Sequence, residues 1–371
     1  MKYRRALFSK KPFDDPVDGV YLNAVREITE YHVRHNPRYA RLLNDNGFDV
    51  SMLKTEKDLE KLPFIPTAVF KKHTLFTLPG KSIPVKVTSS GTRGNAGLIG
   101  FEFSGLWCAL KMVLKIFSFK KLFSFRLTNY VVFGYKPDRK NKTAVSKTAF
   151  GATLFAPGLH RTYALKRKNG VYEADLNGVC RDLERYASSP LPVRFMGFPS
   201  YTYFVMKQLE QNGVALKLPK GSKIMLAGGW KQYYREQVDK TVFYDTAKRV
   251  LGVDDKDVVE FFGAVEHPVC YCDCANHRFH VPTYARVIIR DVTTLEPVGY
   301  GKTGLVELIT PMIKATPITA VMTDDLGVLT PGSECGCGIT SPCLEIIGRV
   351  GLKDVKTCAA GAQKLLGDIK L

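Results

Sequence analysis

The sequence of 371 residues has no apolar run of the length that a membrane helix needs. Such a helix takes about 20 consecutive apolar residues, and every hydrophobic stretch here is interrupted well before that length. The basic start, Met1 to Arg5, leads into no apolar segment, so we expect no secretion signal. Both absences favour a cytoplasmic protein.

Acidic residues are scarce relative to basic ones. The chain has 35 Asp and Glu against 54 Lys and Arg, a formal net charge of +19. This charge favours anionic partners such as nucleotides, coenzyme A or carboxylates. The basic residues are dispersed, and there is no helix-turn-helix, zinc-finger or ribonucleoprotein signature. We therefore expect no nucleic-acid partner.

Helix-like and strand-like segments alternate along the chain. Apolar periodicity predicts two helices within residues 18–47, with a break at Asn36-Pro37, and a basic amphipathic helix over residues 104–123. For this last helix the pattern favours a core helix with lysines reaching to solvent, and membrane contact is the alternative. Short apolar runs predict strands at 130–133, 193–197, 224–227, 258–262 and 287–290, with helices at 200–212 and 231–250. The alternation predicts an α/β fold, and residues 285–329 predict a small β-rich subdomain.

A loop rich in glycine and hydroxyl side chains follows the apolar segment Ile83–Val87. It comprises Thr88, Ser89, Ser90, Gly91, Thr92, Arg93 and Gly94. Glycines allow backbone amides to approach an anion, and hydroxyls add further donors, so the loop suits nucleotide phosphates. It lacks the Gly-Lys-Ser/Thr ending of a Walker A loop, and taken alone a surface turn fits equally well.

Further short motifs follow this loop in a fixed order. They are Gly197-Phe198-Pro199-Ser200-Tyr201, Ala227-Gly228-Gly229-Trp230, Phe261-Phe262-Gly263-Ala264-Val265-Glu266, Thr323-Asp324-Asp325-Leu326 and Gly348-Arg349. The order resembles the adenylate-forming acyl synthetases, most closely the branch of phenylacetate-CoA ligases and LuxE-type acyl-protein synthetases. The resemblance implies an adenylate-forming N-terminal domain over residues 1–347, with a β-rich part at about 267–345. Residues 348–371 would be the hinge and a truncated, vestigial C-terminal domain.

The resemblance implies a role for each motif. Thr88, Ser89, Ser90, Gly91, Thr92 and Gly94 would hold the ATP phosphates, and Gly228, Gly229 and Trp230 would line the adenine pocket. Phe262 and Gly263 belong to the motif that ends in Glu266, which would hold Mg²⁺. Asp325 would bind the ribose hydroxyls, and Arg349 would lie near ribose and phosphate. Magnesium and an arginine would neutralise charge as a carboxylate attacks the α-phosphate.

The sequence departs from the family pattern in several places. Phe262, Val265 and Asp324 replace the usual tyrosine, threonine and glycine of their motifs. The resemblance implies a mobile C-terminal domain with a catalytic lysine after the hinge, whereas here only Val350–Leu371 follow the hinge arginine, so we expect a vestigial domain. Within this tail the candidates for that lysine are Lys353, Lys356 and Lys364.

Cys358 is the expected nucleophile of the tail. LuxE-type synthetases look similar, because a cysteine near their C-terminus receives the acyl group, and a thiolate forms a reactive thioester. Lys353 and Lys356 would lower its pKa. An idle tail cysteine is the alternative.

Cysteines and histidines cluster on both sides of the β-rich segment. Without a secretion signal, such clusters favour metal binding over disulfides. Some phenylacetate-CoA ligase relatives carry a similar pattern that binds zinc, which implies Cys274, His280, Cys335 and Cys337 as structural Zn²⁺ ligands. Cys272, His277 and Cys343 compete for this role. His267, next to Glu266, either faces the substrate carboxylate or is a packed core histidine.

These inferences together predict an acyl-protein synthetase. It would use ATP and Mg²⁺ to convert a long-chain fatty acid to acyl-AMP, and would pass the acyl group to Cys358 and on to a partner such as an acyl reductase. Aromatic residues between Phe195 and Phe204, with Phe101 and Phe103, would line an acyl tunnel. The alternatives are a phenylacetate-type acid:CoA ligase and a non-enzymatic, zinc-stapled scaffold.

Overall fold

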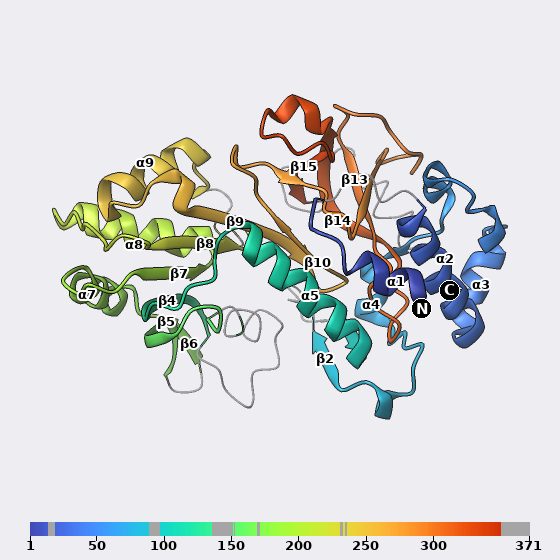
Figure 1. Ribbon diagram of the computed structural model, residues 1–371, viewed down its shortest axis with the longest axis horizontal. Helices are drawn as coiled ribbons and strands as arrows, with labels where there is room; N and C mark the ends of the chain where they lie inside the picture. Colours follow the sequence, from blue (N-terminus) through green and yellow to red (C-terminus); the bar gives the residue numbers. More distant parts are fainter. Residues whose placement is uncertain are drawn as a thin grey trace. The chain divides into compact units, whose positions relative to one another are not determined.

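The computed structural model describes residues 1–13, 19–88, 97–135, 151, 153–168, 171–230, 233 and 236–349. These residues form two compact units (Figure 1). The first unit is Met1–Ile116 with the described part of Gly263–Leu371, and the second is Phe117–Phe262. Across the residues that the structure describes, no helix has both the length and the apolarity to cross a membrane.

The second unit is built on a largely parallel sheet. Its strands are β4 (Thr128–Tyr135), β5 (Gly158–Lys168), β6 (Val171–Ala174), β7 (Val193–Gly197), β8 (Lys223–Ala227) and β9 (Val258–Ala264). They lie in the order β9-β8-β7-β4-β5-β6, and only β6 runs antiparallel to its neighbour. The predicted strands at 130–133, 193–197, 224–227 and 258–262 are confirmed.

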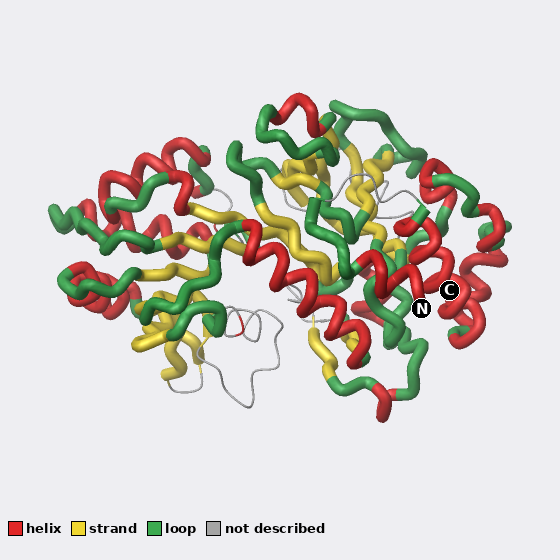
Figure 2. Tube along the Cα trace, viewed as in Figure 1, coloured by secondary structure: helices red, strands yellow, loops and turns green. Residues whose placement is uncertain are grey.

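Helices accompany these strands in the described part of the second unit, and Figure 2 draws them in red against the yellow strands. They are α7 (Leu176–Ala187), α8 (Pro199–Gln211) and α9 (Lys240–Leu251), and the short 3-10 turn η5 (Asp255–Asp257) precedes β9. Strand residues such as Phe195 and Ile224 share one buried cluster with helix residues such as Leu209 and Leu251. Because the middle of the sheet is buried, β4, β7, β8 and β9 contain apolar runs that could be located from sequence, whereas β5 and β6 were not predicted.

The first unit begins with helices. α1 (Lys2–Leu7), α2 (Val20–His35) and α3 (Pro37–Asp45) come first, followed by the 3-10 turns η1 (Val50–Met52) and η2 (Glu56–Lys61). The predicted break lies at Asn36, whose side chain accepts a hydrogen bond from the Tyr39 amide at 3.1 Å, while Pro37 occupies the first helical position. An Asn cap and an N1 proline start a new helix there.

A second, antiparallel sheet carries the β-rich part of the first unit. Its strands are β11 (Phe279–His280), β12 (Arg286–Arg290), β13 (Gly304–Ile309), β14 (Ala320–Thr330) and β15 (Cys343–Arg349), and β10 (His267–Cys272) precedes them in the chain. The order is β11-β15-β14-β13-β12, and the short β1 (Ile65–Pro66) pairs in parallel with β14. The predicted β-rich subdomain is confirmed, and β15 extends it beyond residue 329.

The remaining elements of the first unit lie between β1 and β4. They are α4 (Thr67–Lys72), η3 (Gly80–Ser82), the hairpin of β2 (Val85–Thr88) with β3 (Leu98–Phe101), and α5 (Phe103–Phe119), whose last turn enters the second unit. The N-terminal helices are tied to the sheet by buried tyrosines. Tyr21 donates to the Ile309 carbonyl at 2.8 Å, and Tyr284 donates to the Lys10 carbonyl at 2.6 Å.

Candidate functional site

At one end of the ladder between β14 and β15, two residues that we predict to bind the nucleotide lie opposite each other. Asp325 pairs in register with Arg349, and Arg349 Nε donates to Asp325 Oδ1 at 2.8 Å. The ladder shifts register between Leu326 and Gly327, directly beside this pair. Such a bulge turns neighbouring side chains out of the regular alternation, and bulges are frequent next to functional sites.

Acidic residues surround Arg349. Burial alone would lower the pKa of Arg349, but the carboxylates of Asp325, Asp324 and Glu266 outweigh it and raise that pKa. Glu266 follows β9 and is buried. The first unit therefore brings the predicted magnesium, ribose and hinge residues into one electrostatic neighbourhood.

Helix α4 adds two residues that the sequence did not single out. Lys71 Nζ lies 3.4 Å from Asp324 Oδ2, and Thr67 Oγ1 donates to Asp324 Oδ1 at 3.5 Å. The link arises because β1 pairs with β14, and α4 starts immediately after β1. The pairing of this short strand with one some 250 positions later could not be seen in the sequence.

The base of the glycine- and hydroxyl-rich loop lies against the same helix. Thr88 ends β2 and pairs with Leu98 of β3, so the loop closes a β-hairpin, unlike the strand-to-helix turn of a Walker A motif. A Cβ atom at Gly97 would come within 3.2 Å of the Phe70 backbone, a tight contact that would require this backbone to move by a few tenths of an ångström. The expected phosphate residues Ser89, Ser90, Gly91, Thr92 and Gly94 lie outside the described residues, as do Cys358 and the tail lysines.

Other predicted nucleotide residues lie in the second unit, at one edge of its parallel sheet. Gly197 pairs with Leu226 and Ala227 pairs with Phe261, so the ends of β7, β8 and β9 meet. Ligands of open α/β sheets bind beyond these carboxyl ends. After β8 the exposed Gly228 and Gly229 adopt positive φ angles of 84° and 64°, which turns the chain at this edge.

Trp230, the third residue predicted to line the adenine pocket, packs against other aromatic side chains and is not exposed. Its ring is buried beside Tyr203 and Phe204, with centroid distances of 5.7 and 6.5 Å. Phe262, near the end of β9, is half-buried, and Gly263 is exposed. Of the expected acyl-tunnel residues, Phe195 is fully buried in the core of the second unit, whereas Phe103 is exposed on α5.

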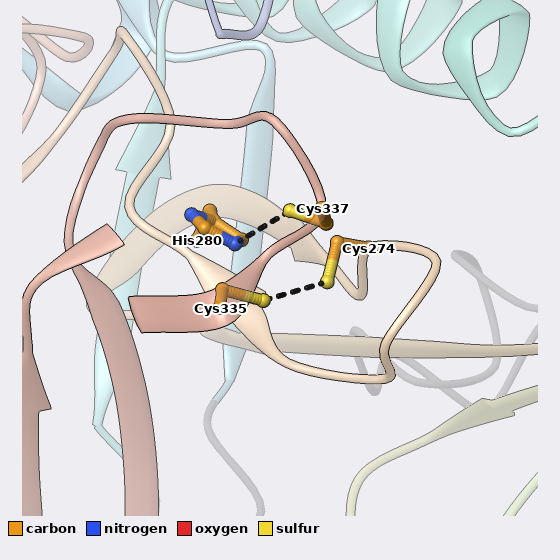
Figure 3. Close-up of side chains that lie close together, drawn as sticks. All are labelled: Cys274, His280, Cys335 and Cys337. Atoms are coloured by element: carbon orange, nitrogen blue, oxygen red, sulfur yellow. Dashed lines mark hydrogen bonds between the residues drawn. The ribbon is translucent and has the colours of Figure 1, made fainter. Parts of the chain in front are cut away.

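Four cysteine and histidine side chains converge in the first unit (Figure 3). The sulfur atoms of Cys274, Cys335 and Cys337 and a ring nitrogen of His280 all lie within 4.8 Å of one another. The Cys274 and Cys335 sulfurs are 3.5 Å apart, and Cys337 Sγ lies 3.2 Å from His280 Nε2. Tetrahedral zinc with bonds near 2.3 Å puts its ligand atoms about 3.8 Å apart, so the set fits zinc.

The surroundings of His280 orient its ring for a metal. Its Nδ1 donates to the Ser341 carbonyl at 2.7 Å, which leaves Nε2 as the lone-pair nitrogen. Burial lowers the pKa of His280 and so favours the neutral ring. Gly336, at φ 72°, lets the chain turn between Cys335 and Cys337.

The competing ligands are arranged differently. His277 Nδ1 is engaged by the buried Asp273 carboxylate at 2.8 Å, and Cys272 is buried outside the cluster. Cys343 Sγ lies 3.4 Å from His280 Nε2, and Cys343 shares a buried cluster with Cys274 and Cys335. The fold brings the four predicted ligands together, and it places Cys343 beside them.

His267 is a packed core histidine. Its ring is fully buried, Nε2 lies 3.2 Å from the Tyr271 hydroxyl, and burial lowers its pKa to about 3. The imidazole is therefore neutral.

Solved structures show which fold the chain has. The structure of 2-hydroxyisobutyryl-CoA ligase in the postadenylation state, in complex with 2-HIB-AMP, is similar with a TM-score of 0.67 and 17% identity, covering 92% of this chain and 69% of that one. An open conformation of this ligase in complex with 2-HIB-AMP and CoA gives a TM-score of 0.66 and 17% identity, covering 90% of this chain and 70% of that one. The fold is that of the adenylate-forming ligases.

The family model described as "Acyl-protein synthetase, LuxE" matches residues 7–366. The chain belongs to this family and is a ligase of the acyl-adenylate type. It is 25% identical over 339 residues to a long-chain-fatty-acid–luciferin-component ligase of Aliivibrio fischeri, covering 90% of this chain and 85% of that one. The Vibrio harveyi ligase of the same name is 23% identical over 336 residues, with 90% and 85% covered. A phenylacetate-coenzyme A ligase of Thermus thermophilus is 23% identical over 335 residues, with 88% and 68% covered.

Proposed function

We propose that this chain activates a long-chain fatty acid with ATP in the cytoplasm and transfers the acyl group to a protein thiol. The acid's carboxylate attacks the α-phosphorus, acyl-AMP forms and pyrophosphate leaves. A thiolate then attacks the acyl carbon, and AMP leaves. The observation that carries this proposal is the grouping of Glu266, Asp325 and Arg349 within a chain that matches the LuxE family from residue 7 to residue 366.

The nucleotide would be held by groups of complementary chemistry. Asp325 would offer carboxylate oxygens to the ribose hydroxyls, and Arg349, whose Nε donates to Asp325, would use its remaining N–H groups to bind phosphate oxygens. Glu266 would hold Mg²⁺, which supplies charge neutralisation at the reacting phosphate. The loop from Thr88 to Gly94 would add backbone amides to the phosphates. Gly228, Gly229 and Trp230, with Phe262 and Gly263, would form the adenine side.

The fatty acid and the final acceptor are proposed from the names of the relatives. Two relatives are long-chain-fatty-acid ligases that act on a luciferin component. We assign Cys358 as the first acceptor, because the family match extends past it to residue 366. An acyl reductase or another acyl-accepting protein would then receive the acyl group.

The test is intact-protein mass after incubation with ATP, Mg²⁺ and a C14 fatty acid. We expect an acyl adduct that hydroxylamine removes, absent in Cys358→Ala and retained in Cys108→Ser, a matched control at a buried cysteine. An adduct that persists in Cys358→Ala would place the acceptor elsewhere. Absence of AMP formation with a broad panel of acids would contradict acid activation itself.

A CoA ligase is the second candidate, favoured by the similarity to the phenylacetate-coenzyme A ligase. It would use free CoA and would not need Cys358. CoA-dependent AMP formation, unchanged in Cys358→Ala and without any protein adduct, would establish this alternative.

We further propose that Cys274, His280, Cys335 and Cys337 hold a structural zinc ion. β14 and β15 link the cluster to the nucleotide residues, because Thr330 pairs with Cys343 at one end of this ladder and Asp325 with Arg349 at the other. The six steps from Cys343 to Arg349 span about 20 Å. At that separation the ion would stabilise the sheet without taking part in the reaction.

Elemental analysis of the purified protein tests the zinc site. We expect about one zinc per chain, lost in Cys335→Ser/Cys337→Ser and kept in Cys108→Ser. Zinc retained in the double variant, or absent from the wild type after expression with added zinc, would overturn the assignment.

A further inference from the structure

Helix α5 has two apolar faces, and only one belongs to the core. Gly105, Cys108, Met112 and Ile116 are buried, as expected for a core helix. The opposite face carries large hydrophobic side chains that are exposed to the following fractions: Phe103 76%, Trp107 58%, Leu110 43% and Leu114 38%. The expectation of a core helix with outward lysines therefore holds for one face only.

These four residues, which we call the α5 outer face, form a continuous stripe. Their spacing of four, three and four positions places them above one another on one side of a helix. Isolated exposed hydrophobic residues are common, but a contiguous stripe marks a surface that contacts something apolar. Trp and Phe are also side chains that settle at the boundary between water and hydrocarbon.

Cations border the α5 outer face. Lys111 Nζ lies 5.8 Å from the centre of the Trp107 ring, one helical turn away. The N-terminal segment lies alongside the helix, because Arg4 Nη2 donates to Ser104 Oγ at 2.8 Å and Lys115 Nζ donates to the Phe8 carbonyl at 2.9 Å. This segment adds further exposed cations: Lys2, Arg5, Lys10 and Lys11.

Acidic residues are absent from the sequence of both segments. Residues 1–13 and 103–121 contain lysines and arginines but neither Asp nor Glu. Two neighbouring acids are already engaged: Glu102 is buried against Arg4 at 3.1 Å, and Glu27 accepts hydrogen bonds from the first amides of α1. A stripe of Phe, Trp and Leu with a cationic border matches the chemistry of an anionic bilayer surface.

We propose that the α5 outer face docks this protein onto anionic membranes. With 17 residues the helix would be about 26 Å long, and its opposite face is held in the core, so it would lie in the plane of the interface. A second copy is a poorer occupant, because a two-fold contact would bring the cationic border against itself. The inference concerns attachment, and it does not depend on the acceptor of the acyl group.

Tryptophan fluorescence offers a direct test, because the chain has two tryptophans and Trp230 is buried. In Trp230→Phe, emission comes from Trp107 alone. We expect it to shift to the blue on addition of phosphatidylglycerol vesicles and to be quenched by brominated lipid. Pure phosphatidylcholine vesicles should have a much smaller effect, and 0.5 M salt should weaken binding, since surface charges are screened within about 5 Å or less at that concentration.

Variants of the α5 outer face test whether this face is the one that binds the vesicles. In vesicle sedimentation, Trp107→Gln/Leu110→Gln should weaken the partition coefficient at least tenfold, and Lys111→Gln should weaken it about fivefold, as expected for one surface charge. The matched control is Met52→Gln/Val242→Gln, which replaces residues that are each 44% exposed on other elements. Circular dichroism melting should be unchanged in all of them.

Three outcomes would overturn the proposal. They are no binding to anionic vesicles, binding that the Trp107/Leu110 variant leaves intact, and a dimer that this variant dissociates without any vesicle binding. Pyrophosphate exchange with a water-soluble C8 acid should be equal in wild type and variant. If exchange fails with every acid while vesicle binding persists, the proposed activity fails and the membrane surface stands.

Discussion

Two arginine–carboxylate pairs occur in the same antiparallel sheet, and their environments differ sharply. Arg290 Nε and Glu307 Oε2 lie 2.5 Å apart, with side chains only 6% and 0% exposed. Arg349 Nε and Asp325 Oδ1 lie 2.8 Å apart, with side chains 53% and 12% exposed. One pair is enclosed by protein, whereas the other keeps its arginine accessible to a ligand.

The hydrogen bonds of the two arginines explain this difference. Arg290 also donates hydrogen bonds to the carbonyls of Leu295 and Glu60, at 3.0 and 2.6 Å. Its guanidinium is therefore held by other parts of the protein. Arg349 stands at the end of β15 beside Asp324 and Glu266, where the surrounding carboxylates raise its pKa. The same residue types thus serve the fold in one place and are available for a nucleotide in the other.

The largest expected effect comes from breaking the buried pair. Glu307→Ala should lower the free energy of unfolding by about 3–5 kcal/mol, because it leaves the Arg290 charge buried without its carboxylate. Urea denaturation at pH 8 measures this. Glu307→Gln, which keeps an acceptor for Arg290, should cost clearly less, and equal losses in the two variants would contradict the ion-pair explanation.

The buried pair should also give the protein a distinctive pH dependence. Burial raises the pKa of Glu307 to about 7, although Arg290 opposes the shift. The native state then holds a proton that the unfolded state releases above about pH 4.5, so stability falls as the pH rises from 4.5 to 7. Between pH 5 and pH 8, the wild type should lose about 3 kcal/mol relative to Glu307→Gln. A difference that is flat with pH would show that Glu307 stays ionised throughout.

For the accessible pair of Arg349 and Asp325 we expect a small effect on stability and a large effect on activity. Arg349→Ala should change the free energy of unfolding by less than about 1 kcal/mol, because the side chain is half exposed. Pyrophosphate exchange should fall by about a hundredfold, the cost of removing one charge-stabilising donor.

Arg249→Ala is the matched control for this variant. Arg249 forms a comparably exposed pair with Glu210 at 2.6 Å, with side chains 57% and 30% exposed, on helices of the second unit. Exchange should be unaffected there. If both variants lose activity equally, or if Arg349→Ala unfolds the protein, the functional role of the accessible pair fails.

The contrast between these pairs also marks what the sequence could reveal. Asp325 and Arg349 were found because each belongs to a short motif, and the resemblance assigned each of them a role at the nucleotide. Arg290 was predicted only as the end of the strand at 287–290, and Glu307 only as part of the β-rich subdomain, because nothing in a strand pattern tells which polar residues pair across it. Cys274, His280, Cys335 and Cys337 were recognisable as a ligand pattern, yet the proximity of Cys343 to His280 depends on the pairing of β11 with β15.

The fold could be predicted where strands are buried on both faces of a sheet. Strands β4, β7, β8 and β9 of the second unit contain apolar runs and were located within a few residues, whereas β5 and β6 carry polar residues and were not predicted. On α5 the same signal misled, because a helix that is apolar on both faces looks like a core helix whether or not both faces are covered. Exposure of Trp107 and Leu110 is a tertiary property that periodicity does not contain.

The smallest expected effect concerns Lys71. Its substitution tests whether helix α4, beside the accessible pair, contributes to ATP binding. Lys71 Nζ and Asp324 Oδ2 lie 3.4 Å apart, with both side chains 34% exposed. Lys71→Met should leave stability within about 1 kcal/mol and raise the KM for ATP by about fivefold or less, because a half-exposed cation contributes little. Lys248→Met is the control, because it breaks a pair of 3.5 Å with Asp254 in the second unit whose side chains are far more exposed. It should change neither the stability nor the KM for ATP. An unchanged KM in Lys71→Met would exclude Lys71 from the nucleotide site and leave α4 as its structural support.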